Sequence, residues 1–303
     1  MGVLVVGSVA FDTVRTPFGA GTEVLGGSAS YFSMAASYFT QVSLVAAVGE
    51  DFGEDHLAPL RGRGVDLRGL SRVPGRTFRW EGEYGHDLNN AKTLRTELGV
   101  FESFRPRVPE EYRSTDVLFL ANIDPEIQAD VLGQVRRPRL VACDTMNFWI
   151  SGKRDALVAL LGKIDVLLIN DGESRQLSGE SNLVRAARVI GEMGPRTIVI
   201  KRGEYGALLF HGGSIFSAPA YPLEKVLDPT GAGDSFAGGF VGYLARTADA
   251  SEDAMRRAVI VGSVMASLNV EDFSLTRLTR TNEDEISKRY GDFQRLTSFQ
   301  KLV

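Results

Sequence analysis

Residues 228–239 read DPTGAGDSFAGG, a glycine-rich turn that opens directly into an amphipathic run. Gly231 and Gly233 can take backbone angles closed to other residues and leave the backbone N–H groups uncovered. Because a helix N-terminus carries unpaired donors and a partial positive charge, the stretch predicts a binding site for an anion such as a phosphate. Asp234 stands beside that site, although a carboxylate repels a phosphate. It either suits the helix dipole or takes a proton from a hydroxyl that attacks phosphorus.

The composition excludes several classes of protein. The 303 residues are 44% hydrophobic and 24% charged, a normal balance for a globular chain with one large or two modest domains. A net charge of −4 lacks the basic footprint of a nucleic-acid-binding protein. A single cysteine, Cys143, excludes an internal disulfide and fits a reducing cytosol. No apolar run reaches membrane-spanning length and residues 1–12 lack a signal peptide, so we expect a cytoplasmic protein without a membrane partner.

Most of the chain alternates between short apolar runs and helical patterns, which predicts an α/β fold with a mostly parallel central sheet flanked by helices. Strands are expected at Val3–Gly7, Val42–Val48, Val117–Ala121, Leu140–Cys143, Val166–Asn170 and Thr197–Lys201. Helices are expected after Gly26-Gly27, within 51–65, near 125–134, 153–162, 182–193 and 252–268, directly after the opening stretch, and in the polar tail. Residues 207–210 and 214–217, separated by HGG, are typical of an edge hairpin.

Residues 76–100 break this rhythm. RTFRWEGEY and KTLRTELGV alternate in side-chain character with a period near two and are joined by GHDLNNA, which predicts an antiparallel hairpin. We interpret it as a small antiparallel β lid inserted into a single domain over 1–303, with 13–25 supplying its other strands. Phe78, Trp80 and Tyr84 alternate onto one face of the lid. They could cover a bound substrate, pack within the lid or form a dimer contact.

Four features occur together in order along most of the chain: an early Asp12, the di-glycine Gly26-Gly27, NxxE at 170–173 and DPTGAGD. In this combination the sequence resembles the ribokinase-like (PfkB-type) carbohydrate and nucleoside kinases, and DPTGAGDSFAGGF is the specific part of the match. The resemblance implies phosphoryl transfer from ATP with Mg²⁺ as cofactor. It implies that Asp234 is the catalytic base and that Gly231, Ala232 and Gly233 form the backbone anion hole.

The resemblance also implies an acceptor side and a metal side. Asp12 matches the Asp that binds acceptor hydroxyls, and Gly26 and Gly27 match the di-glycine that approaches the acceptor. SASYF follows the glycines where several members have a Lys or Asn that touches sugar, so that contact is missing or replaced. Asn170 and Glu173 match NxxE, which suits a hydrated Mg²⁺. From the residues alone, a helix start is the favoured interpretation, with Asn170 or Asp171 as cap and Glu173 in the first turn.

The remaining candidates lie at strand ends, where ligands bind in an open α/β sheet. Lys201 and Gly203 match a strand end beside the nucleotide, where many members have an uncharged residue in place of Lys201. Thr230 matches the approach to the anion hole, and Asp228 matches a position where some members bind a monovalent cation such as K⁺. Further candidates are Asn122, assigned to the substrate, and Asp144 and Asn147, which lie where they could reach phosphate, metal or substrate.

Other functions fit the sequence less well. GxxxxGK[ST] does not occur, which argues against a P-loop kinase, and GSVAFD after the first strand lacks the dinucleotide fingerprint. A sensor that kept the fold but lost catalysis has no need of Asp234. We rank an ATP-dependent carbohydrate kinase acting on a small sugar or sugar acid first and a nucleoside kinase second. A lid sheet with an exposed apolar face also makes a homodimer through the lid an expectation.

Overall fold

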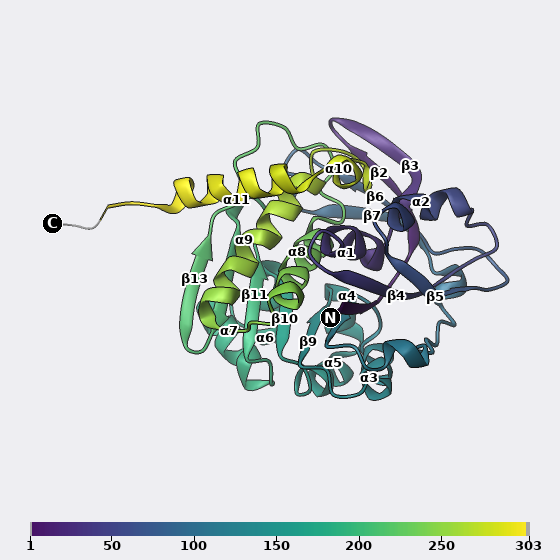
Figure 1. Cartoon of the computed structure of the whole chain (residues 1–303), viewed down its shortest axis with the longest axis horizontal. Helices are drawn as coiled ribbons and strands as arrows, with labels where there is room; N and C mark the ends of the chain where they lie inside the picture. Colours follow the sequence, from purple (N-terminus) through teal and green to yellow (C-terminus); the bar gives the residue numbers. More distant parts are fainter. Residues whose placement is uncertain (1, 301–303) are drawn as a thin grey trace.

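The computed structural model describes residues 2–300 and shows a nine-stranded sheet covered by helices (Figure 1). The strands lie in the order β13-β12-β11-β10-β9-β8-β1-β4-β5. Their bounds are β1 Gly2–Val6, β4 Gln41–Val48, β5 Asp66–Arg72, β8 Val117–Leu120, β9 Leu140–Asp144, β10 Val166–Asn170, β11 Thr197–Lys201, β12 Ala207–His211 and β13 Ser214–Ala218. The strands from β11 to β5 are parallel, whereas β12 and β13 pair antiparallel at one edge.

The sheet is covered on both faces because its central strands are apolar throughout. Alternate residues of one strand enter different cores: Val3 and Val5 face one core, whereas Leu4 and Val6 face the other. The first core includes α1 Ser28–Ala36, α2 Glu54–Gly62, α8 Ala232–Thr247, α9 Glu252–Asn269, α10 Thr276–Arg280 and α11 Glu283–Thr297. The second includes α3 Pro125–Gln134, α4 Asn147–Gly152, α5 Arg154–Leu161, α6 Asp171–Ser178 and α7 Leu183–Glu192, with 3₁₀ turns at Gly99–Phe101 and Glu110–Tyr112.

A second sheet of four strands forms the lid. It has the order β3-β2-β6-β7, with bounds β2 Ala10–Thr16, β3 Gly19–Gly26, β6 Arg79–Tyr84 and β7 Ala91–Glu97. Each hairpin is antiparallel, as predicted, but the two hairpins meet through a parallel pairing of β2 with β6, so the lid is mixed. The register places Asp12 beside Trp80. Neighbours in register project to one face, so Asp12 and Trp80 share a face of the lid.

The sequence predicted most elements within a few residues and missed others. The first lid segment was expected to begin at residue 13, but β2 begins at Ala10, so Asp12 lies inside the lid strand. The edge strand β5 was not predicted, since DLRGLSR is polar and only half-buried. The helices α4 and α10 were not predicted as separate elements, and α6 appeared only as the alternative interpretation of NxxE. Each has eight residues or fewer, too short to show helical periodicity.

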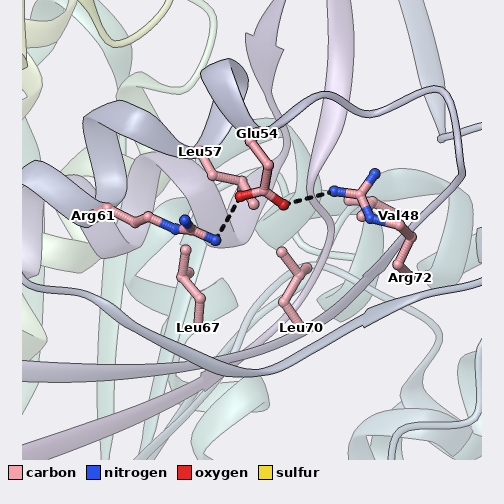
Figure 2. A pocket seen from close by; sticks show the side chains of 7 residues that line it. All are labelled: Val48, Glu54, Leu57, Arg61, Leu67, Leu70 and Arg72. Carbon is pink, nitrogen blue, oxygen red and sulfur yellow. Dashed lines mark hydrogen bonds and ion pairs between the residues drawn. The ribbon is translucent and has the colours of Figure 1, made fainter.

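One hollow lies between α2 and β5, at the edge of the main sheet (Figure 2). Leu57, Leu67 and Leu70 form its apolar lining. Glu54 crosses it with two ion pairs, to Arg61 at 2.6 Å and to Arg72 at 3.0 Å. None of the residues predicted to carry chemistry lines this hollow. Within residues 2–300, no helix combines the length and the hydropathy needed to cross a membrane.

Close helix contacts fix the position of α8, the helix that begins at the DPTGAGD turn. A Cβ on Gly238 would overlap the Phe32 carbonyl of α1 and approach Ala35 Cβ to 2.8 Å. On the other side, a Cβ on Gly239 would lie 2.9 Å from the Val261 carbonyl of α9. Glycine therefore allows α8 to pack tightly between α1 and α9, and this packing fixes where its N-terminus points.

We expect Gly238→Ala to lower the free energy of unfolding by roughly 1–3 kcal/mol, the usual cost of overpacking. Gly133→Ala is the matched control, since Gly133 is an exposed residue of α3 with no neighbour near its Cβ position. Alanine there should leave stability unchanged or raise it by up to about 1 kcal/mol through helix propensity. Urea denaturation measures both. Equal effects of the two substitutions would contradict the tight contact between α1 and α8.

Candidate active site

The site is built around the first turn of α8. Gly231 precedes the helix with φ of 74°, and a side chain there would overlap the ring of Tyr31, so only glycine fits. Ala232 begins the helix, and its N–H donates to the Pro229 carbonyl at 3.1 Å, so this amide is engaged within the turn. Asp234 is the third helical residue. The structure thus places a carboxylate at the N-terminus of a helix fixed by its neighbours.

Asp234 lies between charges of both signs. Burial, together with the carboxylate of Asp144, raises its pKa to about 7, against an opposing effect of Lys201. Lys201 Nζ lies 3.0 Å from the Cβ position of Gly233 and 2.8 Å from Asp144 Oδ2. A group with this pKa exchanges a proton readily near neutral pH, which is what a general base requires.

The opposite side of the site is formed by the lid strand β2 and the di-glycine. Asp12 is 5% exposed, and a Cβ on Gly26 would overlap its carboxylate, so the glycine makes room for the acid. Burial and the nearby Asp228 raise the pKa of Asp12 to about 7, while the Gly27 N–H lowers it. Gly27 has φ of 91° and passes close to the Ser8 carbonyl where α1 begins. Both predicted glycines are thus required by the backbone and by Asp12.

Asp228 and Thr230 lie under the same turn. Asp228 Oδ1 accepts from the Thr230 N–H at 2.9 Å, and Asn269 Nδ2 donates to the Thr230 carbonyl at 2.8 Å. Asp228 is fully buried, which raises its pKa. Asp228 Oδ2 and Asn269 Oδ1 are both buried without a partner among the described residues. Two unsatisfied oxygens in one buried region fit a small cation such as K⁺. The sequence predicted Asp228 at a cation site but not Asn269, which is the last residue of α9.

The two interpretations of NxxE both have support. Asn170 caps α6, with Asn170 Oδ1 accepting from the Glu173 N–H at 2.7 Å and Glu173 Oε2 accepting from the Asn170 N–H at 2.9 Å. Burial and Asp144 nevertheless raise the pKa of Glu173 to about 7, while Lys201 opposes them. Asp144 and Glu173 fit a hydrated Mg²⁺, which keeps several waters and needs few protein ligands. Within residues 2–300, no cluster of three or more metal-ligating side chains occurs.

Lys201, at the end of β11, interacts with the carboxylates of Asp144 and Glu173. Burial disfavours its ammonium form, but Asp144 and Glu173 outweigh burial and raise the pKa of Lys201. Gly203, in a 3₁₀ turn over Gly203–Tyr205, has φ of 54°, and a side chain there would overlap the Asn89 carboxamide. Asn89, in the loop between β6 and β7, also donates to Glu204 Oε1 at 3.3 Å. The lid therefore reaches across the site to the predicted nucleotide side.

The predicted lid aromatics have different surroundings. Phe78 stacks on Phe101 with ring centroids 5.7 Å apart, which is a packing role. Trp80 covers Gly82, on the face of the lid that carries Asp12, and its Nε1 donates to Thr93 at 3.2 Å. Tyr84 reaches Thr230 of the turn, whose hydroxyl donates to the Tyr84 oxygen at 3.3 Å.

Two strand-end candidates are occupied by local contacts. Asn122 Oδ1 accepts from Trp149 Nε1 at 3.1 Å, and Asn147 Oδ1 accepts from the Phe148 N–H at 2.9 Å. Within residues 2–300, neither side chain hydrogen-bonds to Asp12 or Asp234. The structure instead adds Tyr31 of α1, which the sequence did not single out. The only sequence signal was the SASYF segment that departs from the expected Lys or Asn.

A mostly parallel sheet, a β lid and a carboxylate on the first turn of a helix are together typical of a phosphotransferase of ribokinase-like fold. Residues 3–281 match the family model described as the pfkB family carbohydrate kinase. The chain belongs to the PfkB family of carbohydrate kinases. Its fold is similar to that of ribokinase from Thermotoga maritima, with a TM-score of 0.76 at 20% identity, covering 96% of this chain and 99% of the other.

Curated relatives include kinases with different acceptors. A cytidine kinase of Thermococcus kodakarensis is 30% identical over 250 residues, which cover 80% of this chain and 88% of the relative. A 2-dehydro-3-deoxygluconokinase of Thermoproteus tenax is 28% identical over 235 residues, covering 72% of each. Family membership thus establishes a kinase, and the relatives span both nucleosides and sugar acids.

The buried acids should reduce stability at high pH. Asp12 has a folded-state pKa near 7, above its unfolded value, so its protonation stabilises the fold at low pH and this stabilisation is lost as pH rises through 7. We expect Asp12→Asn to raise the free energy of unfolding at pH 8, by roughly 2–4 kcal/mol on the scale of one pKa unit per 1.36 kcal/mol. The gain should shrink toward pH 4. Urea denaturation at both pH values measures it, and a gain independent of pH would contradict the assignment.

Proposed function

We propose that this chain transfers the γ-phosphoryl group of ATP to a hydroxyl of a small carbohydrate acceptor, with Asp234 as the base. The observation that carries the proposal is the position of Asp234 on the first turn of α8. Burial and the carboxylate of Asp144 raise its pKa, and the cation Lys201 lowers it. Asp234 in turn acts on the buried carboxylate of Asp12. Its pKa near 7 lets it accept a proton at neutral pH. A protein that only senses a sugar has no use for this base.

In the proposed reaction, the ionised carboxylate of Asp234 takes the proton of the acceptor hydroxyl as its oxygen attacks the γ-phosphorus. The bond between that phosphorus and the bridging oxygen of ADP breaks, and ADP leaves with the electron pair. The N-terminus of α8, with Gly231, Ala232 and Gly233, stabilises negative charge on the group in transfer. Asp12 and the backbone of Gly26 and Gly27 hold the acceptor.

The nucleotide side comprises Asn170, Lys201, Gly203 and Thr230 in this proposal. Kinases of this family use ATP with Mg²⁺. When bound, Mg²⁺ neutralises phosphate charge, and Asn170, Glu173 and Asp144 are the residues that would hold it through water. Lys201 supplies a fixed positive charge next to Gly233. The buried oxygens of Asp228 and Asn269 would hold K⁺ beneath the turn.

For the acceptor, a free sugar or sugar acid and a nucleoside remain the two candidates. The nucleoside is favoured by the similarity to a cytidine kinase over 88% of that protein. It is also favoured by Trp80, an aromatic side chain that shares the lid face of Asp12 and could stack on a base. We propose that Asn122 also binds the substrate. To do so, Asn122 Oδ1 would exchange its hydrogen bond from Trp149 Nε1 for one from the substrate.

We expect Asp234→Asn to lower turnover by roughly 10²–10⁴-fold, the usual contribution of a positioned base, while ATP binding changes little. Asp284→Asn is the control, because Asp284 is an exposed first-turn acid of α11 and matches any contribution to a helix dipole. ADP release with a set of sugars and nucleosides measures turnover. Turnover of the Asp234 variant close to that of the control would contradict the proposed role.

Lys201→Met should raise the KM for ATP by about tenfold or more, since hydrogen bonds to charged groups contribute roughly 1.5–3 kcal/mol. Lys201→Arg should retain part of the affinity. Lys153→Met is the control, because Lys153 also bridges two acids, Asp124 and Glu126, but lies outside the proposed site. Initial rates at fixed acceptor concentration measure the effect. An increase confined to the KM for the acceptor would contradict the assignment of Lys201 to the nucleotide side.

A further inference from the structure

Tyr31 occupies a central position in the site. It belongs to α1, directly after the di-glycine turn, and its ring packs against Gly231 at the start of α8. The side chain is 1% exposed, and its hydroxyl has no partner among residues 2–300. An unsatisfied buried hydroxyl costs free energy, and native structures seldom retain one unless water, an ion or a ligand completes it.

The groups around this hydroxyl are those that define the acceptor side. Burial, then the charges of Asp12, Asp228 and Asp234 and the hydroxyl of Tyr84, raise the pKa of Tyr31 well above its usual value. Tyr31 therefore stays protonated and can donate a hydrogen bond. Tyr31 follows the di-glycine that makes room for Asp12, and its ring packs on Gly231 just before Asp234, so it lies beside the space that the proposed function assigns to the acceptor.

The charged groups that act on Asp12 are carboxylates. Burial and Asp228 raise the pKa of Asp12, and Asp234 raises it less. Lys201, the cation that acts on Asp234, lies at Gly233 and is bonded to Asp144. The lid arginines are already ion-paired with acids: Arg15 with Glu81, Arg79 with Glu23 and Asp51, and Arg95 with Glu97.

Arg15 and Arg79 lie on the face of the lid opposite to the one that carries Asp12. Arg79 and Arg15 alternate with Trp80 and Gly82 across the paired strands β2 and β6, so they project away from the face that carries Asp12. Lys92 lies in register with Glu83, which puts it on the same face as Arg15. On the face that carries Asp12, a carboxylate or phosphate on the acceptor would therefore meet Asp12 and Asp234, and neither Lys92 nor the lid arginines. Like charges in contact disfavour binding strongly.

We propose that Tyr31 donates a hydrogen bond to an acceptor hydroxyl, and that the site selects an uncharged, polyhydroxylated acceptor over one that carries a carboxylate or phosphate. This rests on the proposed function, and it removes sugar acids from the acceptors considered above. A neutral sugar or polyol and the ribose of a nucleoside share this chemistry. Tyr31 is then a specificity-determining residue in place of the Lys or Asn absent from SASYF.

The first test compares neutral acceptors with anionic counterparts that keep a hydroxyl for phosphorylation. Ribose with ribonate, glucose with gluconate, and uridine with orotidine, whose carboxylate is on the base, are assayed for ADP release, with cytidine and adenosine as further neutral acceptors and 2-dehydro-3-deoxygluconate as a further anion. Binding to the Asp234→Asn variant is measured by calorimetry in parallel. We expect neutral members to be preferred by about 100-fold in kcat/KM or in Kd. Preference for an anion, or binding of no neutral member, overturns the inference. Neutral binding without turnover supports it and contradicts the proposed kinase activity.

The second test is Tyr31→Phe, which removes one oxygen and keeps the ring against Gly231. We expect the acceptor KM to rise about tenfold with the ATP KM unchanged, and discrimination against singly deoxygenated analogues of the best acceptor to fall. Without acceptor, the variant should unfold at the same or a higher temperature, because an unsatisfied hydroxyl is gone. Tyr221→Phe is the control, since its hydroxyl donates to Asp292 of α11. Unchanged discrimination by Tyr31→Phe overturns the assignment.

Discussion

The proposed site depends on one electrostatic constraint. In the proposed function, the N-terminus of α8 attracts a phosphate while Asp234, a carboxylate, stays beside it. The structure resolves this conflict by distributing charge. Lys201 lies at Gly233 and offsets the negative charge there, while burial and Asp144 keep the pKa of Asp234 near 7. The carboxylate is therefore ionised only part of the time near neutral pH. A base that is easily neutralised repels an incoming phosphate less than an ordinary aspartate would.

Holding these groups together requires backbones to approach more closely than side chains usually permit. Gly26 makes room for the carboxylate of Asp12, Gly231 for the ring of Tyr31, and Gly238 for the carbonyl of Phe32. The contacts at Gly231 and Gly238 tie α1 to the DPTGAGD helix, and the contact at Gly26 joins the lid strands β3 and β2 directly before α1. The lid strand, α1 and α8 therefore form one rigid corner, and the acids in it are buried by packing that the rest of the sheet stabilises.

The sequence predicted the parallel sheet, the edge hairpin and the lid because apolar periodicity and turn residues are local signals. It could not predict β5, whose polar residues carry no such pattern, nor the parallel junction of β2 with β6. The same division applies to the site. Asp234, Asp228 and the glycines follow from a local motif, whereas Tyr31 and Asn269 join the site only through packing between distant helices. The pairing of Lys201 with Asp144 spans 57 positions and has no local signal.

The position of Asp12 within β2 has a consequence for how the two substrates meet. Asp12 belongs to the lid sheet and also faces the acceptor side, so the lid cannot move far without moving an acceptor-binding group. At its other end, the lid touches the nucleotide side through Asn89 and Glu204, and its middle touches the turn through Tyr84 and Thr230. A single small sheet thus contacts all three parts of the site. Closing it over both substrates would exclude water and favour transfer to the acceptor over hydrolysis of ATP.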